Sequence, residues 1–155
     1  MRQFCLTLCV LLSGCMLGNQ GPATKLTEAV QSMDKATRWG QVAEAARMVD
    51  ATYRAQFVAN HASWGQQIQL GDSEIANMEI APGGETAIAL MAYQWYLTDA
   101  MTLHQTVVRQ RWTRTDDGYA LISEAVVQGD PRLFAARPSS APEPSPSEIT
   151  LLGSE

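Results

Sequence analysis

The sequence predicts an α+β domain in which helices come first and a four-stranded antiparallel meander follows. Between residues 24 and 57, apolar side chains recur every three or four positions, which is the period of a helix packed on a core. From residue 66 to 128 the period changes to two, and glycine-bearing turns divide this part into strands. Helices that precede an antiparallel sheet are expected to cover one of its faces.

Thr24 is expected to cap the first helix, whose apolar side is formed by Leu26, Val30, Met33 and Thr37. A second helical stretch follows Gly40, and Asp50 and Arg54 are expected to form an i,i+4 pair on it. A break at Gly40 and a break near Asp50 both fit the pattern. The apolar stripe of this second stretch comprises Trp39, Val42, Ala46, Val49, Tyr53 and Phe57.

Four strands are expected after the helical part, which ends at residues 60–65. The first is either one long strand bent by a bulge at Gly71-Asp72 or two short strands. The second is apolar on both faces, as is typical of a buried central strand. The expected strands span residues 66–80, 86–97, 101–114 and 119–128, with turns at 82–85, 98–100 and 115–118 and a stop at 129–131.

The N-terminus has the order of a secretory signal. Arg2 is followed by an apolar run from Phe4 to Leu12, too short to span a bilayer of ~30 Å, and then by Ser13, Gly14 and Cys15. An ordinary signal peptide cleaved elsewhere is the alternative, but no A-x-A site follows the run.

The LSGC ending of this run, residues 12–15, resembles the lipobox of bacterial lipoproteins. The resemblance implies cleavage between Gly14 and Cys15 and attachment of acyl chains to Cys15, which makes the membrane its first partner. Met16, rather than Asp, follows the cysteine, and the resemblance then implies the periplasmic face of the outer membrane. In a bacterium with one membrane, the same motif implies the outer face of that membrane.

The cysteine count agrees with lipidation. Cys5 and Cys9 lie in the signal, so the mature chain keeps only Cys15 and has no internal disulfide. The expected organisation is a signal peptide over residues 1–14, a lipidated tether over 15–23, an α+β domain over 24–134 and a disordered Pro/Ser-rich tail over 135–155. Residues 149–152 of the tail are either a docking peptide or a loose end.

Composition excludes several classes of function. Removal of Arg2 with the signal changes the formal net charge from −5 to −6, which argues against nucleic acid as a partner. Two distant histidines do not make a zinc or calcium site, and no catalytic or phosphate-binding motif occurs. We therefore expect no cofactor and no metal.

The segment from residue 39 to 134 is similar to the nuclear transport factor two-like, or cystatin-like, superfamily. The similarity lies in the order of elements and in the final hairpin, where Trp112 is followed by Gly118 and Tyr119. The superfamily pattern there often reads W-x-x-x-x-G-W. Here five residues separate Trp112 from Gly118, and a tyrosine replaces the second tryptophan. The resemblance implies a conical fold that encloses a pocket, and it implies no single function.

His104 on the third strand is one candidate for chemistry, as a general base beside Asp99 or Glu124 inside the cone. A half-exposed strand histidine is the favoured interpretation. The other histidine, His61, is expected in the loop between helix and strand.

Aromatic residues on the middle strands either line an apolar pocket, with Arg109 or Arg111 steering an acidic group, or form the core. The core interpretation is favoured, because Tyr93 and Trp95 point to one face and Tyr96 to the other. Trp112 completes this aromatic set. The arginines at 109, 111 and 114 are expected on a solvated strand face or against an acidic partner.

Together these features predict a lipid-anchored, non-enzymatic protein of the cell envelope whose domain binds a partner, expected to be a protein. One alternative is a small-molecule binder or enzyme that uses the interior pocket near His104. Another is an assembly accessory of a larger envelope complex.

Overall fold

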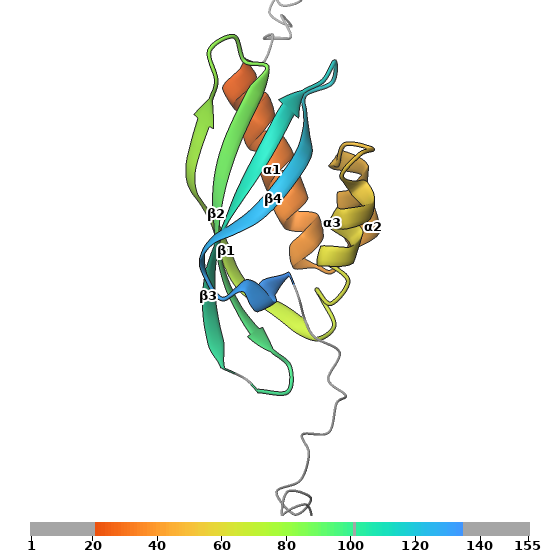
Figure 1. The fold of residues 1–155 in the computed structure, drawn as a ribbon, viewed down its shortest axis with the longest axis vertical. Coiled ribbons are helices and arrows are strands. Elements are labelled where there is room, and N and C mark those ends of the chain that lie inside the picture. The colour runs from red at the N-terminus through yellow and green to blue at the C-terminus, as the bar shows by residue number, and fades with distance from the viewer. Residues whose placement is uncertain (1–20, 101, 135–155) are drawn as a thin grey trace, which may run out of the picture.

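The computed structural model describes residues 21–100 and 102–134, which form helices packed on one antiparallel sheet (Figure 1). The helical part comes first, as the sequence predicts, and the meander follows. The elements are α1 (Pro22–Arg38), α2 (Val42–Ala45), η1 (Ala46–Met48), α3 (Arg54–Asn60), β1 (Ile68–Ile80), β2 (Thr86–Leu97), β3 (Leu103–Arg114), β4 (Tyr119–Gly129) and η2 (Pro131–Leu133).

The sheet order is β1-β2-β3-β4, and all neighbouring strands are antiparallel. β1 is a single strand whose register shifts between Leu70 and Asp72 and again between Ile75 and Asn77, so the bent-strand alternative is correct. β4 carries two further shifts, one opposite Arg111 and Trp112 and one opposite Val107 and Val108. A bulge adds one residue to a strand and changes which side chains face the core beyond it.

Helix α1 crosses the inner face of the sheet and buries the predicted apolar positions Leu26, Val30, Met33 and Thr37. It begins at Pro22, two residues before the expected cap Thr24, because proline's fixed φ suits the first helical turn. Pro22 lies beside Gly84 in the turn between β1 and β2. At its other end, the Arg38 guanidinium donates to the Gly71 carbonyl of β1 at 2.8 Å.

The second helical stretch consists of α2, η1 and α3, and the break near Asp50 lies between η1 and α3. The Asp50 carboxylate accepts hydrogen bonds from the backbone N–H and the hydroxyl of Thr52, which turns the chain before α3. Arg54 donates to the carbonyls of Ala46 and Val49, so the expected ion pair with Asp50 does not form. Trp39 is 71% exposed, and its assignment to the buried stripe is wrong because the helix ends there.

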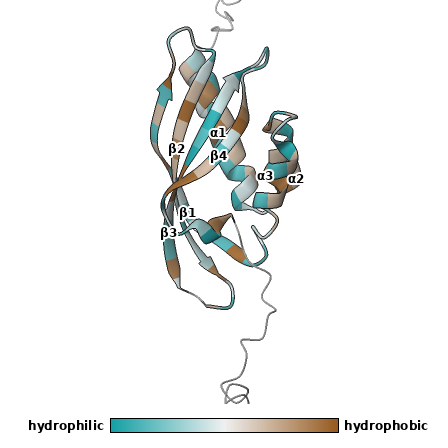
Figure 2. Ribbon diagram, in the orientation of Figure 1, coloured by the Kyte–Doolittle hydropathy of each residue, from teal (hydrophilic) through white to brown (hydrophobic). Residues whose placement is uncertain are grey.

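The core lies between the helices and the inner face of the sheet. Figure 2 shows apolar and polar residues interspersed along the strands, and along β2 and β3 the buried positions alternate with more exposed ones. The largest fully buried aromatic side chains are Trp64, Trp95, Trp112 and Phe57. The core interpretation is therefore confirmed for Tyr93, Trp95 and Trp112, whereas Tyr96 is half-buried on the other face of β2.

Strand β2 is central, but it is buried on one face only. Its inward residues Ala87, Ala89, Met91, Tyr93 and Trp95 are buried, whereas the alternate positions are exposed or half-buried. The expectation of burial on both faces is wrong, because the described helices cover only the inner face (Figure 1). The outer face of the sheet is left apolar along β2 and uncovered by any described element.

The segment 130–134 closes the end of the core that lies away from Pro22. Leu133 is fully buried, and its carbonyl accepts a 2.8 Å hydrogen bond from the Trp64 indole. Gly129 allows this turn with a φ of +89°. Any Cβ at that position would overlap the carbonyl oxygen of Gln105. The predicted strand end at residues 129–131 is confirmed.

Candidate functional site

The interior holds a polar cluster that joins α3 to the sheet. Gln110 on β3 and Glu124 on β4 are register partners, and the Gln110 amide donates to Glu124 Oε1 at 3.1 Å. His61 follows the last turn of α3, and its Nε2 lies 3.6 Å from Glu124 Oε2. The Tyr53 hydroxyl accepts from the backbone N–H of Glu124 at 3.2 Å. These four residues therefore bring α3, β3 and β4 together at Glu124.

Burial determines the protonation of this cluster. The His61 and Glu124 side chains are each 1% exposed. Burial raises the pKa of Glu124 to about 8, although the hydrogen bond from Gln110 opposes the rise. Burial also lowers the pKa of His61 to about 4, and the hydrogen bond to the Phe57 carbonyl opposes that fall. The pair is within ion-pair distance, yet both groups are neutral near pH 7.

Because His61 is neutral, only one of its two ring nitrogens carries a hydrogen atom. His61 Nδ1 lies 2.9 Å from the Phe57 carbonyl, so it carries the proton and donates to that oxygen. Nε2 is then a bare acceptor that faces the protonated carboxyl of Glu124. The separation of 3.6 Å is too long for a direct hydrogen bond.

Several polar atoms of this region lack a partner in the described part of the chain. They are Gln110 Oε1, Glu124 Oε2 and the indole Nε1 of Trp112, which lies two residues from Gln110 on the same strand. Unpartnered buried polar atoms are rare in native proteins and commonly mark an ordered water or another small molecule. The arrangement offers a donor, an acceptor and an acid to such a molecule.

Aromatic rings enclose His61 on its remaining sides. Phe57 stacks on the imidazole at 4.1 Å, while Trp64 and Phe134 lie at centroid distances of 4.3 and 5.2 Å. This apolar shell keeps the imidazole desolvated, which is the first cause of its lowered pKa.

His104 lies outside this cluster. It is half-buried and stacks on Trp95 at 4.6 Å, and its Nδ1 is 3.1 Å from Asp130 Oδ2. Asp130 also pairs with Arg132, whose hydrogen bonds lower the pKa of that carboxyl. The half-exposed interpretation of His104 is confirmed, and the pairing with Asp99 or Glu124 is wrong.

The proposed aromatic pocket with steering arginines is also wrong. Tyr93, Trp95 and Trp112 point to the inner face and are buried. Arg109 and Arg111 alternate with them in register and lie exposed on the outer face. The expectation of a solvated arginine face is confirmed for these two residues, whereas Arg114 is exposed but does not share their face of β3.

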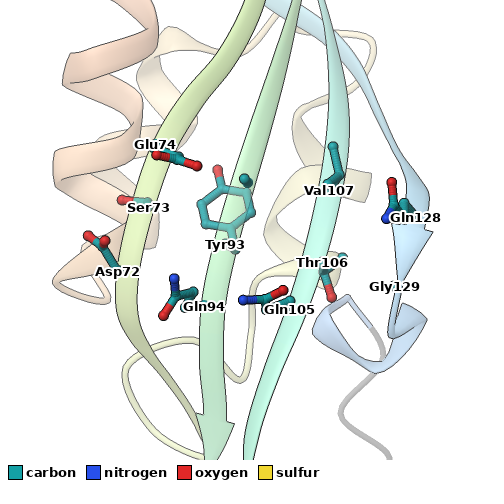
Figure 3. Close-up of a pocket in the computed structure, with 11 residues that line it drawn as sticks. Asp72, Ser73, Glu74, Tyr93, Gln94, Gln105, Thr106, Val107, Gln128 and Gly129 are labelled. Atoms are coloured by element: carbon teal, nitrogen blue, oxygen red, sulfur yellow. The ribbon is translucent and has the colours of Figure 1, made fainter.

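A shallow hollow of about 330 Å³ lies across the four strands, and its rim is polar (Figure 3). Gln94 and Gln105 are side by side in its floor, with Asp72 and Glu74 toward β1 and Gln128 toward β4. These side chains offer amide and carboxylate groups to solvent.

Gly14 and Cys15, the predicted cleavage and lipidation site, lie outside the described residues, as does the tail from residue 135. Among residues 21–100 and 102–134, no three His, Cys, Asp or Glu side chains are placed to hold a metal ion. Within the same ranges, no helix has both the length and the apolar character needed to cross a membrane.

Comparison with known proteins adds a likeness of fold. No protein-family model matches the sequence, and no curated protein matches it. The intermembrane-space region of the chloroplast protein ARC6 has a similar structure, with a TM-score of 0.51 at 11% identity. The alignment covers 69% of this chain and 97% of that one. The fold class these findings define is α+β, with helices packed against an open four-stranded antiparallel sheet.

The sequence did not reveal the Glu124 cluster, because a bulge changes the facing of β4. Trp112 pairs with Leu121 and Arg111 with Ser123, so Ile122 is the extra residue. Without that bulge, strict alternation from buried Leu121 would turn Glu124 outward. The one available signal was a single acid within the apolar run of residues 119–128.

Proposed function

We propose that the chain is a lipid-anchored protein of the cell envelope, held by acyl chains on Cys15 at the periplasmic face of the outer membrane. Its domain is a non-enzymatic binding module of the nuclear transport factor two-like kind. The observation that carries the proposal is the LSGC sequence directly after a short apolar run, in a chain whose other cysteines precede it.

The start of the domain supports a position close to the membrane. Helix α1 begins at Pro22, and Gly21 is only six residues beyond Cys15. A stretch of that length reaches at most about 20 Å. The end of the domain that carries Pro22 and the β1–β2 turn therefore faces the bilayer.

The packing supports binding through the surface. Large aromatic side chains fill the space between helices and sheet, whereas the outer face of the sheet remains open. The similar fold of the ARC6 region, which belongs to a chloroplast protein, shows that this architecture occurs in a protein exposed to an intermembrane space.

Fatty-acid labelling tests the anchor. Cells that express the full chain are grown with labelled palmitate, and the protein is recovered by immunoprecipitation. We expect label on the parent chain and on Cys9→Ala, which alters only the apolar run, and none on Cys15→Ala. Treatment with globomycin should accumulate the precursor. Label retained by Cys15→Ala, or no precursor, would contradict the anchor.

Crosslinking in intact membranes followed by pull-down tests the binding module. We expect a specific envelope protein to copurify with the parent chain. Recovery of the chain without any other protein would contradict an envelope partner.

A second candidate function is favoured by one observation, the unpartnered polar atoms around Glu124. In this alternative, the interior binds a small polar molecule or transforms it, at Glu124 rather than near His104. A crystal structure of the protein purified from its host distinguishes the two. Density for an organic molecule bonded to Glu124 and Gln110 supports the alternative, whereas water or tight packing there contradicts it.

A further inference from the structure

The polar cluster around Glu124 contains more hydrogen-bonding groups than its direct contacts use. Within residues 21–100 and 102–134, Gln110 Oε1, Glu124 Oε2 and Trp112 Nε1 are buried and have no hydrogen-bond partner. In the same ranges His61 Nε2 forms no hydrogen bond, since its polar neighbour Glu124 Oε2 is 3.6 Å away. Leaving polar atoms unpaired in the interior is costly, so this group of atoms calls for a shared partner.

The unused groups are the ones that a water molecule needs as partners. His61 is neutral near pH 7, so its Nε2 is an acceptor, and Gln110 Oε1 is a second acceptor. Glu124 Oε1 accepts from Gln110, which leaves the acid hydrogen on Oε2, and the Trp112 indole N–H is a second donor. Water donates two hydrogen bonds and accepts two, so it complements these two acceptors and two donors.

The distance between His61 and Glu124 also fits a bridging water. At 3.6 Å, Nε2 and Oε2 are too far apart for a direct hydrogen bond. An oxygen atom beside the line that joins them can lie at about 2.8 Å from both. The rings of Phe57, Trp64 and Phe134 enclose the imidazole, so the surroundings favour a molecule with a single heavy atom over a larger one.

We propose that the domain binds one water molecule between His61 and Glu124 as a permanent part of its structure. The water accepts a hydrogen bond from the Glu124 O–H and donates one to His61 Nε2, so it joins β4 to the residue that follows α3. Gln110 Oε1 and the Trp112 N–H, both from β3, are its remaining partners. Buried waters in proteins commonly make about two to four such bonds.

This water completes the attachment of α3 to the sheet. Tyr53 precedes α3, and its hydroxyl accepts directly from the backbone N–H of Glu124. His61 follows α3 and reaches the side chain of the same residue through the water. Both ends of the helix are then held at Glu124, one directly and one through solvent. The inference is independent of the lipid anchor, and it opposes the alternative in which this site takes an organic molecule.

Nuclear Overhauser transfer from water to the tryptophan indole protons tests the site, with the isotope-labelled full chain in detergent. Trp64 is the matched control, because its indole is also buried but donates to the Leu133 carbonyl. We expect a cross-peak between water and the Trp112 indole proton, with the sign of a bound water, and a several-fold weaker one at Trp64. Equal cross-peaks at the two indoles, none at Trp112, or cross-peaks from an organic molecule overturn the proposal.

Two substitutions of Glu124 test its part in holding the water. Glu124→Met has a similar length but no polar atom to bond the water, so the cross-peak at Trp112 should fall several-fold. Glu124→Gln keeps an N–H donor and lacks an acid proton that could relay magnetisation from solvent, so the cross-peak should remain. A cross-peak that survives in Glu124→Met, or one that disappears in Glu124→Gln, overturns the proposal. If Glu124→Met does not fold, the parent chain and Glu124→Gln still decide the result.

Discussion

His61 Nε2 lies 3.6 Å from Glu124 Oε2 in the interior of the domain, and the two side chains are equally buried. They arrive from α3 and from β4, so this contact spans the interface between the helical part and the sheet. Because both groups are neutral near pH 7, the interface contains no buried charge pair at that pH. The stability of this interface should therefore fall when the pH rises toward 8 and when it falls toward 4.

Replacing Glu124 by glutamine should remove one of these dependences. The pKa of Glu124 is raised from 4.5 to about 8, so the folded state holds a proton that the unfolded state has lost. Its contribution to stability is complete below pH 4.5 and is lost as the pH rises to about 8. Urea unfolding of Glu124→Gln between pH 6.5 and 8.5 should show a shallower fall in the free energy of unfolding than the parent.

Glu74→Gln, on the exposed outer face, is the matched control and should follow the parent. The lower pH range is left out because His61 acts there in the opposite sense. Its pKa is lowered from 6.5 to about 4, so stability is lost as the pH falls through that range. Parallel curves for Glu124→Gln and the parent above pH 6.5 would rule out a buried, protonated Glu124.

Gly129→Ala should be strongly destabilising. The substitution combines a left-handed φ with overlap between the new Cβ and the Gln105 carbonyl. Gly83→Ala has a similar φ of +91° but no neighbour within 4 Å, so it isolates the backbone cost of about 1–2 kcal/mol. Urea unfolding should place Gly129→Ala at least ~2 kcal/mol below Gly83→Ala. Similar values for the two would contradict the close approach of β3 to residue 129.

Trp39→Ala should leave stability within about 0.5 kcal/mol of the parent, because the side chain is 71% exposed. Trp95→Ala removes a fully buried indole that donates to the Thr106 hydroxyl, so its expected cost is about 3–5 kcal/mol. Thermal and urea unfolding measure both. A large loss of stability in Trp39→Ala would contradict the exposed position of Trp39.

Tyr119→Phe should cost about 1–3 kcal/mol, because it leaves a buried carbonyl without its donor. The Tyr119 hydroxyl donates to the Gly84 carbonyl at 2.7 Å and ties β4 to the β1–β2 turn. Tyr96→Phe, at a half-buried position of β2, should stay within about 0.5 kcal/mol. Urea unfolding of the two variants side by side measures the difference, and equal effects would contradict the tie.

The order of elements and the strand limits were predictable because periodicity reports directly on which side chains are buried. Leu26, Val30 and Met33 are buried on α1, and the limits of β2 agree with the prediction. The exposure of Trp39 was not predictable. Its spacing fits the apolar stripe of the second helical stretch, but the helix axis changes direction at Gly40. The positive φ of that glycine, +67°, ends the first helix.

The polar cluster around Glu124 could not be predicted from the sequence for a different physical reason. The bulge at Ile122 changes the facing of the residues from Ser123 to Val126, including Glu124, until the second bulge of β4 reverses it. His61 was predicted in a loop, yet it is 1% exposed because the rings of Phe57, Trp64 and Phe134 surround it. The partner that His104 does have, Asp130, lies beyond the last strand.

The segment at Leu133 places the two ends of the described domain far apart along α1. Gly21 leads into the domain beside the β1–β2 turn, whereas Phe134 leaves it beside His61, toward the other end of α1 (Figure 1). Helix α1 has 17 residues, which corresponds to about 25 Å. In the proposed acylated form, the domain would act as a rigid spacer that sets Phe134 up to about one helix length farther from the bilayer than Gly21.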